Sequence, residues 1–556
     1  MAYSHQKYRP APAVDLPDRS WPSRSIQKAP RWCSVDLRDG NQALAEPMGQ
    51  EKKQQLFDLL LKVGFREIEL GFPSASQTEF DFLRWVASRQ LPPDITPQVI
   101  TQARGPLIER TFESLKGFAR STVHVYNSTS EVQRRVVFRK SRAEIVELAV
   151  GATRFVKEVA AKYPGLDVIY QYSPESFTGT ELEFALEICE AVVDAWNPSE
   201  EHKMILNLPS TVENTTPNVF ADRIEWFSRN LSRRSAVILS VHAHNDRGTG
   251  VATAELAQLA GAERIEGTLL GNGERSGNVD LVTLAMNLYS QGIDPELDLS
   301  CLPEVIRTVE QCTAMRVHPR HPWAGELVYT AFSGSHQDAI HKGINEPVPQ
   351  DGAWEVPYLP IDPTDVGRNY EAVIRINSQS GKGGMAHVLE RDYGYRIPRA
   401  MAVDFSHLVQ EVADKTGEEL APAAIVQLFR ARYLAAQSDR TVRAIRVSQT
   451  NAERVVDAEV LVDGHWQGVH GRGGGALEAF ANGLRVIYPG DWDISHYAEH
   501  ARGTGAAADA VAYVTLCVPS APGPFFGVGE DGDVVAATFL ALQAALAKTV
   551  ASAAAR

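Results

Sequence analysis

The stretch Val241-His242-Ala243-His244-Asn245-Asp246-Arg247-Gly248 follows a short apolar run from Ala236 to Ser240. Apolar and β-branched residues in a run of this length predict a buried strand. Because residues i and i+2 of a strand point to the same face, His242 and His244 should project together at its carboxyl end. Two imidazoles on one face can hold a metal ion. Two ordinary polar histidines beside a turn would give the same pattern, so other strand ends must supply the remaining ligands.

Composition excludes several classes of function. The 556 residues are enough for two to four domains with full cores. A formal net charge of −14 without a basic block argues against nucleic acid or an anionic membrane as partner. Five scattered cysteines suit a reducing cytoplasm, and no apolar run reaches the roughly 20 residues of a membrane-spanning helix. Residues 1–30 lack the apolar core of a signal peptide, so we expect an extended arm.

Residues 31–301 alternate short apolar runs with helical patterns. The predicted strands are Trp32–Leu37, Glu67–Leu70, Thr96–Thr101, Thr122–Tyr126, Val168–Tyr172, Met204–Leu208, Val237–Val241 and Arg264–Leu269. The clearest predicted helices between them are Glu51–Val63, Ser76–Ser88, Arg142–Tyr163, Glu181–Trp196, Pro217–Leu231 and Thr249–Gly261. Eight β-α units predict an α/β fold with a (β/α)8 TIM barrel. An open doubly wound sheet is the alternative, but no Gly-rich dinucleotide motif follows the first strand.

Polar residues gather where the predicted strands end, which is the face where barrel enzymes keep their active sites. Asp39 follows strand one, His242 and His244 end strand seven, and Asn278 follows strand eight. These strands are neighbours when a barrel closes. One carboxylate, two imidazoles and an amide oxygen favour Mg, Mn, Zn or Co. Two octahedral positions would stay open for a 2-oxo acid, on which the metal would act as a Lewis acid.

Further polar side chains could line the same mouth. Arg38 stands beside Asp39 and could stabilise negative charge that develops on a keto oxygen. The other candidates are His124, Ser173, Glu175 and Thr211. Each of these, taken singly, is more often an ordinary loop or core polar group.

Beyond the barrel we expect two further regions. Residues 302–440 should be helical linker subdomains, with a long Pro/Gly-rich crossing from Gly343 to Arg368 and helices at Phe405–Lys415 and Ala421–Tyr433. Residues 441–556 read as two halves of three strands and a helix, which predicts an internally duplicated α+β domain. The recognisable segments are Thr441–Val447, Val455–Val462, Trp466–His470, the helix Ala476–Val486, Ala510–Cys517, Phe525–Gly529 and the helix Asp533–Lys548.

Three motifs carry a specific resemblance: Asp36–Gln42, His242–Asp246 and Gly271–Asn278. They resemble the signatures of the acyl-CoA-condensing, metal-dependent TIM-barrel enzymes. Within that group the chain is most similar to the 2-isopropylmalate synthases, in the long form found in actinobacteria. The segments Ser333–Asp338 and Tyr358–Pro363 also resemble these synthases, and the likeness covers nearly the whole chain.

The resemblance implies a reaction and a set of roles. Acetyl-CoA, 3-methyl-2-oxobutanoate and water would give 2-isopropylmalate and CoA, the committed step of leucine biosynthesis. Asp39, His242, His244 and Asn278 would hold a divalent metal, Mg above all, and a monovalent cation could activate the enzyme. Arg38 would contact the keto oxygen, and His124, Ser173, Glu175 and Thr211 would shape the oxo-acid pocket.

The resemblance also implies a homodimer in the cytoplasm. His336 and Tyr370 match residues that reach the active site of the partner subunit, and the methyl-group base would be Glu175, His336 or Tyr370. The C-terminal domain would be regulatory and bind leucine at its Gly-rich turn, which contains Gly473 and Gly475.

That turn departs from the family. Its usual sequence is Gly-x-Gly-Asn-Gly-Pro, whereas this chain has Gly471-Arg472-Gly473-Gly474-Gly475-Ala476. Without the Asn and Pro the turn should be looser, and Glu478 adds a charge nearby. We therefore expect weakened or altered leucine inhibition. The alternatives to the synthase are a homocitrate or citramalate synthase, a lyase or carboxyl-transfer barrel, and a non-catalytic leucine sensor.

Overall fold

The computed structural model describes residues 5–347, 349, 351–368, 382–416, 420, 422–434, 441–450, 453–503, 508–519, 521 and 523–554. The chain divides into two compact units. The first unit comprises residues 1–328 with 363–368, and the second comprises residues 329–362 with 369–556. The predicted division at residues 30, 301 and 440 stays a prediction. No helix among the described residues has the length and apolar character needed to cross a membrane.

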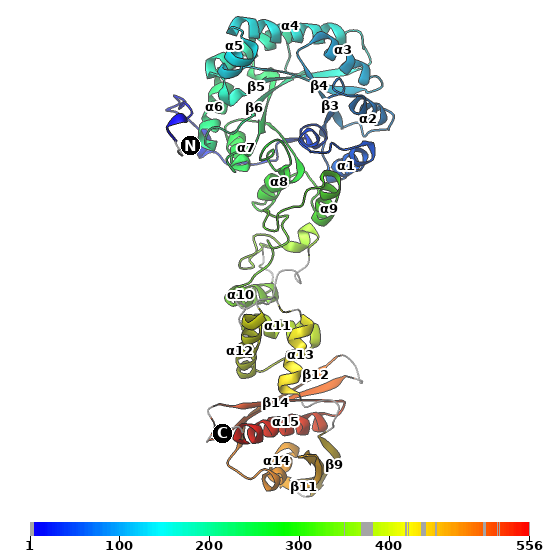
Figure 1. Ribbon diagram of the computed structural model, residues 1–556, viewed down its shortest axis with the longest axis vertical. Helices are drawn as coiled ribbons and strands as arrows, with labels where there is room; N and C mark the ends of the chain where they lie inside the picture. The colour runs from blue at the N-terminus through cyan, green and yellow to red at the C-terminus, as the bar shows by residue number, and fades with distance from the viewer. Residues whose placement is uncertain are drawn as a thin grey trace. The chain divides into compact units, whose positions relative to one another are not determined.

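The first unit is built on a closed barrel of strands β1 to β8 in chain order (Figure 1). Each strand pairs in parallel with the next, and β1 pairs with β8 to close the barrel. The strands are β1 (Arg31–Ser34), β2 (Glu67–Gly71), β3 (Thr96–Gln102), β4 (Arg120–Ser128), β5 (Asp167–Glu175), β6 (Met204–Ser210), β7 (Val237–Ala243) and β8 (Arg264–Gly267). The predicted TIM barrel is confirmed.

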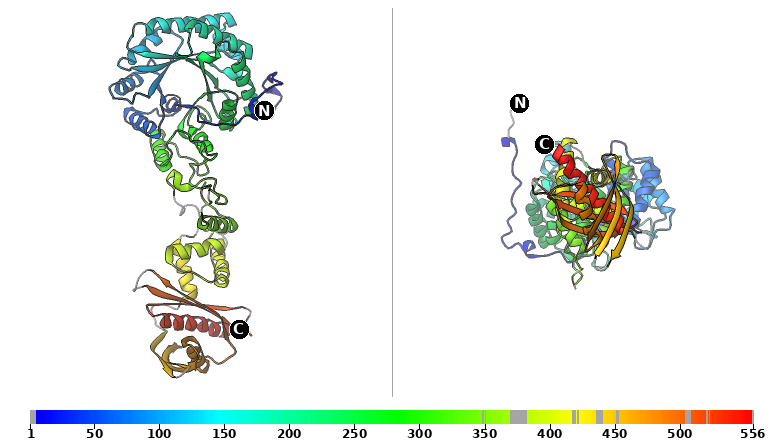
Figure 2. Two further views of the ribbon diagram at one scale, coloured as in Figure 1. Left: turned by 180° about the vertical axis from the view of Figure 1, so that it is seen from behind. Right: turned by 90° about the horizontal axis from the view of Figure 1, so that it is seen from below.

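Helices surround this barrel, as Figures 1 and 2 show from opposite sides. They are α1 (Gln50–Val63), α2 (Gln77–Ala87), α3 (Gly105–Ser114), α4 (Arg142–Ala160), α5 (Leu182–Trp196), α6 (Pro217–Asn230), α7 (Gly250–Leu259), α8 (Leu281–Tyr289) and α9 (Leu302–Thr313). Local sequence sets their starts. Ser141, for example, accepts a hydrogen bond from the amide of Glu144, whose carboxylate bonds back to the Ser141 amide, and this capping box begins α4.

Strands β1 and β8 end earlier than predicted. β1 stops at Ser34, and Asp36–Gly40 form a single π-helical turn. The amides of the last three residues of that turn all donate to the carbonyl oxygen of Val35. β8 stops at Gly267 and continues into a short 3-10 turn, Leu269–Gly271. The apolar residues in both turns resemble strand residues because they are buried, but the tight turns redirect the polar residues that follow.

The inside of the barrel contains a network of buried charges. Arg264 is fully buried and donates to Glu67 at 2.6 Å, to Glu266 at 2.7 Å and to Gln98 at 2.8 Å. Strand alternation explains the network, since Arg264 and Glu266 share the inner face of β8, and Glu67 and Glu69 share that of β2. Removal of one partner would leave a buried charge uncompensated.

The second unit begins with helices α10 (Gly334–Asn345), α11 (Lys382–Tyr393), α12 (Arg399–Thr416) and α13 (Pro422–Tyr433). The predicted helical linker is confirmed. The predicted start of the irregular crossing at Gly343 is wrong, because Gly343 belongs to the last turn of α10.

Two three-stranded antiparallel sheets follow, in the orders β11-β10-β9 and β12-β13-β14. Their elements are β9 (Val442–Thr450), β10 (Glu453–Val462), β11 (His465–Gly473), α14 (Ala476–Ile487), β12 (Asp493–Arg502), β13 (Asp509–Cys517), β14 (Phe525–Asp531) and α15 (Val534–Ala554). Sequence patterns did not locate β12, because this edge strand is mostly exposed and carries few apolar side chains. The two halves confirm the predicted α+β domain with internal duplication.

Each half packs the last strand of its sheet closely on its helix. A β-carbon added at Gly471 of β11 would overlap the carbonyl oxygen of Ala479 in α14, and one at Gly527 of β14 would overlap that of Ala541 in α15. The rings of Phe480 and Phe539 stack with centroids 3.9 Å apart, which joins the two helices. Both halves therefore use the same close approach of helix to strand.

Candidate active site

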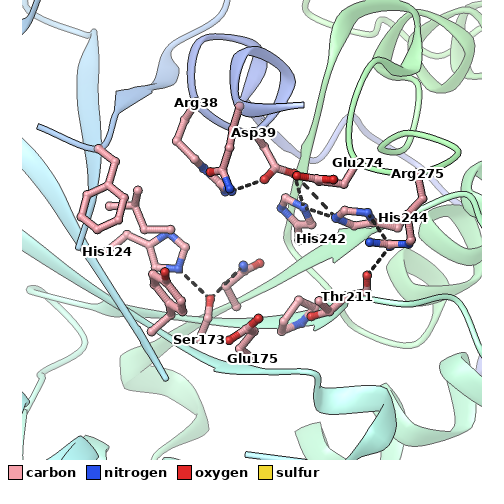
Figure 3. A pocket seen from close by; sticks show the side chains of 16 residues that line it. Arg38, Asp39, His124, Ser173, Glu175, Thr211, His242, His244, Glu274 and Arg275 are labelled. Carbon is pink, nitrogen blue, oxygen red and sulfur yellow. Dashed lines mark hydrogen bonds and ion pairs between the residues drawn. The ribbon is translucent and has the colours of Figure 1, made fainter. Parts of the chain in front are cut away.

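The carboxyl ends of the barrel strands enclose a cavity of about 260 Å³ (Figure 3). Its lining comes from all eight strand ends or the loops that follow them. The lining residues are Arg38, Asp39, Gln42, Phe72, Ile100, His124, Tyr126, Ser173, Glu175, Asn207, Pro209, Thr211, His242, His244, Glu274 and Arg275. The structure therefore brings together eight of the predicted site residues at one cavity.

Asp39, His242 and His244 converge at one side of this cavity. Asp39 Oδ2 lies 3.3 Å from His242 Nε2 and 3.6 Å from His244 Nε2. The two Nε2 atoms are 3.2 Å apart. All three residues are buried, and they form the single His/Cys/Asp/Glu group among the described residues with ligand atoms close enough to share a metal ion. Two imidazoles and one carboxylate are suitable ligands for a divalent cation.

Two buried oxygens support a cation at this position. Asp39 Oδ2 and Asn278 Oδ1 have no hydrogen-bond donor in the part of the chain that the structure describes. Buried oxygens rarely lack partners unless a water or an ion provides one. The backbone of Asn278 pairs with that of His244, so its amide belongs to the same group of residues. The residues present thus fit a divalent cation.

The ionisation of the three side chains follows from their surroundings. Burial opposes a charge on Asp39, but the Arg38 guanidinium holds the pKa of this carboxyl below its usual range. Burial also opposes a charge on His242, yet the neighbouring carboxylates of Asp39 and Glu266 raise its pKa to about 9. Burial and the neighbouring His242 lower the pKa of His244 to about 3. The Asp39 carboxylate is therefore ionised and the His244 imidazole neutral, whereas a cation that binds His242 would displace a proton from its ring.

Arg38 is held between two carboxylates. It forms ion pairs with Asp39 and Glu69, and only 11% of its side chain is exposed. Burial alone would lower the pKa of Arg38, but Asp39 and Glu69 raise it above its ordinary value. This arrangement fixes a permanent positive charge at the cavity wall.

The other predicted lining residues lie on neighbouring strands. His124 Nδ1 is 2.9 Å from Glu69 Oε1, and its Nε2 is 2.7 Å from the Ser173 hydroxyl. Glu175 accepts a hydrogen bond from Ser128, and Thr211 Oγ1 accepts one from the Ser176 amide at 2.9 Å. All four of these residues therefore line the cavity at the barrel mouth, as the sequence predicts.

Comparison with known proteins supports a single assignment. Sequence profiles match residues 29–309 as HMGL-like, residues 326–390 as the post-catalytic domain of alpha-isopropylmalate synthase, and residues 419–550 as the LeuA allosteric (dimerisation) domain. The chain is 53% identical over 547 residues to the 2-isopropylmalate synthase of Pseudomonas savastanoi pv. phaseolicola, covering 98% of this chain and 97% of the relative. The chain belongs to the 2-isopropylmalate synthase family.

Another member, from Rhodospirillum rubrum, is 54% identical over 544 residues, with 97% of each chain covered. The predicted family resemblance is confirmed. Its actinobacterial subtype stays a prediction.

His336, a predicted residue of the family site, is not among the described residues that line the cavity. His336 lies in α10 of the second unit, where its ring stacks on Tyr358 at a centroid distance of 3.9 Å. Tyr370 lies outside the described residues. Their predicted action on a partner subunit stays a proposal.

The predicted effector glycines flank the start of α14. Gly473 ends β11, and Gly475 is the N-cap residue of the helix. Between them, the Gly474 amide donates to the Glu478 carboxylate at 2.8 Å. Sequence reasoning treated Glu478 only as an added charge, whereas it also provides an acceptor for an amide at the start of the helix.

Sequence reasoning missed the carboxylates behind the site and part of its wall. Glu266 lies 3.0 Å from His242 Nδ1, and Glu69 holds both Arg38 and His124. The sequence does carry a signal for Glu69 and Glu266, because charged residues alternate with apolar ones in the short strands that contain them. Arg275 belongs to the Gly271–Asn278 motif but was not predicted as a site residue, and its guanidinium lies 3.0 Å from His244 Nδ1.

Proposed function

We propose that this chain condenses acetyl-CoA with 3-methyl-2-oxobutanoate and water to give 2-isopropylmalate and CoA, the first committed step of leucine biosynthesis. The observation that carries the proposal is the buried group of Asp39, His242 and His244 beside Arg38, at the barrel mouth of a 2-isopropylmalate synthase family member. Such an enzyme is an acyltransferase that works in the cytoplasm.

Asp39, His242, His244 and Asn278 would hold the divalent cation. The mixture of oxygen and imidazole ligands without thiolate favours Mg, with Mn, Zn and Co as alternatives. When bound, the cation supplies Lewis-acid polarisation of the oxo-acid carbonyl. Glu266 prepares the site, since by accepting the Nδ1 proton of His242 it leaves Nε2 free to face the cation.

The cavity suits a small branched oxo acid. His124, Ser173 and Thr211 provide polar contacts, while Ile100, Pro209 and the rings of Phe72 and Tyr126 provide apolar wall for an isopropyl group. Arg38 stabilises the negative charge that develops on the keto oxygen as the new carbon–carbon bond forms.

The methyl group of acetyl-CoA must lose a proton before it can attack the ketone. Glu175 lines the cavity and is one candidate base. His336 and Tyr370 are the others, and we propose that they act on the active site of the partner in a homodimer. The match of residues 419–550 to the LeuA allosteric (dimerisation) domain supports this assembly, and also leucine as effector at Gly473 and Gly475.

The decisive experiment measures release of the CoA thiol from acetyl-CoA with Mg or Mn across a panel of 2-oxo acids. We expect 3-methyl-2-oxobutanoate to exceed pyruvate and 2-oxoglutarate by at least about tenfold in kcat/KM. The apolar wall should favour an isopropyl group over the smaller methyl group of pyruvate and over the charged side chain of 2-oxoglutarate. Preference for pyruvate would indicate a citramalate synthase, and preference for 2-oxoglutarate a homocitrate synthase. Thiol release with none of these acids would contradict the proposal.

A further inference from the structure

Ser173, His124 and Glu69 form a hydrogen-bonded chain, and its members Ser173 and His124 also provide polar contacts for the oxo acid. Ser173 Oγ lies 2.7 Å from His124 Nε2, and His124 Nδ1 lies 2.9 Å from Glu69 Oε1. The three residues come from β5, β4 and β2. Ser173 and His124 also line the cavity, where Figure 3 shows them joined by a dashed line.

The direction of each hydrogen bond follows from the neighbours of this chain. Burial opposes a charge on Glu69, but the Arg38 guanidinium lowers the pKa of its carboxyl, so Glu69 accepts the proton on His124 Nδ1. His124 Nε2 then carries a lone pair and accepts the Ser173 hydroxyl proton. Asn207 Nδ2 donates to Ser173 Oγ at 3.1 Å, which leaves the serine proton directed at the imidazole.

A hydroxyl group, an imidazole within hydrogen-bond reach and a carboxylate that orients the imidazole are the parts of a proton-abstracting relay. We propose that His124, oriented by Glu69, is the general base that activates water through Ser173 to hydrolyse the thioester left by the condensation. This inference rests on the proposed function, since it assigns the second half of the same reaction.

The step balances without any further reactant. Water gives a proton to Ser173 Oγ while the serine proton passes to His124 Nε2. The resulting hydroxide forms a bond to the thioester carbonyl carbon, and the tetrahedral intermediate collapses by breaking the carbon–sulfur bond. The proton on His124 returns through Ser173 to the CoA thiolate. The products are one carboxylic acid and one CoA thiol.

The relay is joined to the residues that would hold the cation. Besides Ser173, Asn207 Nδ2 donates to Glu266 Oε2 at 3.1 Å, and Glu266 accepts the Nδ1 proton of His242. Asn207, Ser173 and His242 also line the same cavity. A thioester formed in this cavity therefore does not need to leave it to meet the relay.

The test supplies the CoA thioester of 2-isopropylmalate directly, at saturating concentration, and measures thiol release. We expect His124→Ala and Ser173→Ala to slow this hydrolysis by about 10²- to 10⁴-fold, the usual contribution of a general base. Added imidazole should restore part of the rate of His124→Ala, which a purely structural histidine would not allow. Ser121→Ala is the matched control, because Ser121 is a buried β4 serine that bonds to the Pro97 carbonyl outside the cavity.

A second measurement separates the two half-reactions. Exchange of the acetyl-CoA methyl hydrogens with deuterated water, in the presence of oxo acid, reports the proton removal that precedes condensation. At saturating oxo acid, His124→Ala and Ser173→Ala should reduce this exchange much less than they reduce hydrolysis, and the condensed thioester should accumulate.

Hydrolysis at the unaltered rate in both variants would overturn the relay. So would equal loss of exchange and hydrolysis, which would reduce His124 and Ser173 to oxo-acid binding. An unaltered protein that hydrolyses the supplied thioester but never condenses would overturn the proposed function and leave the relay supported.

Discussion

Glu266 links His242, which would hold the cation, to the charge network inside the barrel. It accepts the Nδ1 proton of His242 at 3.0 Å and is held by Arg264 at 2.7 Å. Glu266→Gln should weaken Mn binding by about 10- to 100-fold, because a glutamine no longer fixes the tautomer that frees Nε2. Titration calorimetry of the full chain measures this. Glu263→Gln is the control, since Glu263 is 45% exposed and pairs with Arg234 outside the site. Equal Mn affinity in the two variants would contradict the prediction.

Asp36 makes the stability of the barrel depend on pH. Burial raises the pKa of its carboxyl to about 7, although hydrogen bonds from Ser34 and the Leu269 amide oppose the shift. The ordinary value in an unfolded chain is about 4. Between these values the folded state binds the extra proton, so stability should fall as pH rises from about 4 to 7.

Asp36→Asn should remove this pH-dependent loss of folding free energy, which is on the order of 1–3 kcal/mol at pH 7. Thermal unfolding of the first unit across this pH range tests it, with the half-exposed Asp94→Asn as a control. A pH slope that survives in Asp36→Asn and matches the control would contradict this assignment.

At the scale of elements, the contact between β11 and α14 depends on glycine. A β-carbon at Gly471 would overlap the Ala479 carbonyl, whereas one at Gly468 of the same strand would meet no atom within 4 Å. Gly471→Ala should therefore destabilise the second unit by about 1–3 kcal/mol, as overpacked cores do. Urea unfolding compares it with Gly468→Ala, which should change stability little. Equal urea midpoints for the two variants would contradict the prediction, because α14 would then move away from β11 without loss of stability.

At the scale of the whole molecule, the two units should respond to different ligands. Removal of divalent cations with a chelator should abolish thiol release and lower the unfolding temperature of the first unit alone. A cation at a hundred times its Kd stabilises a folded site by about 2.7 kcal/mol. Leucine should raise the transition of the second unit, whose residues 419–550 match the allosteric domain.

Calorimetry of the full chain measures both transitions, and Asp39→Asn should lose the cation response while it keeps the leucine response. A cation effect on the second unit in that variant would contradict the assignment of the site.

The leucine response also tests the altered Gly-rich turn. Glu478 replaces part of the missing capping by accepting from the Gly474 amide, so the turn remains held at one point. The expectation of weakened or altered inhibition stays a prediction. If leucine inhibits thiol release as strongly as it does in a relative with the usual turn, the prediction of weakened inhibition is wrong.

Local sequence patterns were enough to predict the barrel and the face that carries its chemistry. Strand and helix periodicity is local, so eight alternating units predicted the (β/α)8 fold, and polar residues at strand ends predicted Asp39, His242 and His244 on one face. The three motifs were specific enough to indicate the family that full-length similarity then established.

Which side chains contact one another depends on the folded arrangement of the strands. The partners of His124 and His242 are Glu69 and Glu266, which come from other strands and become neighbours only when the barrel closes. The edge strand β12 also escaped sequence reasoning, because an exposed strand leaves little apolar pattern. Hydrophobic periodicity records which face of an element is buried, whereas ion pairs and relays depend on distances between elements, and the fold alone sets those distances.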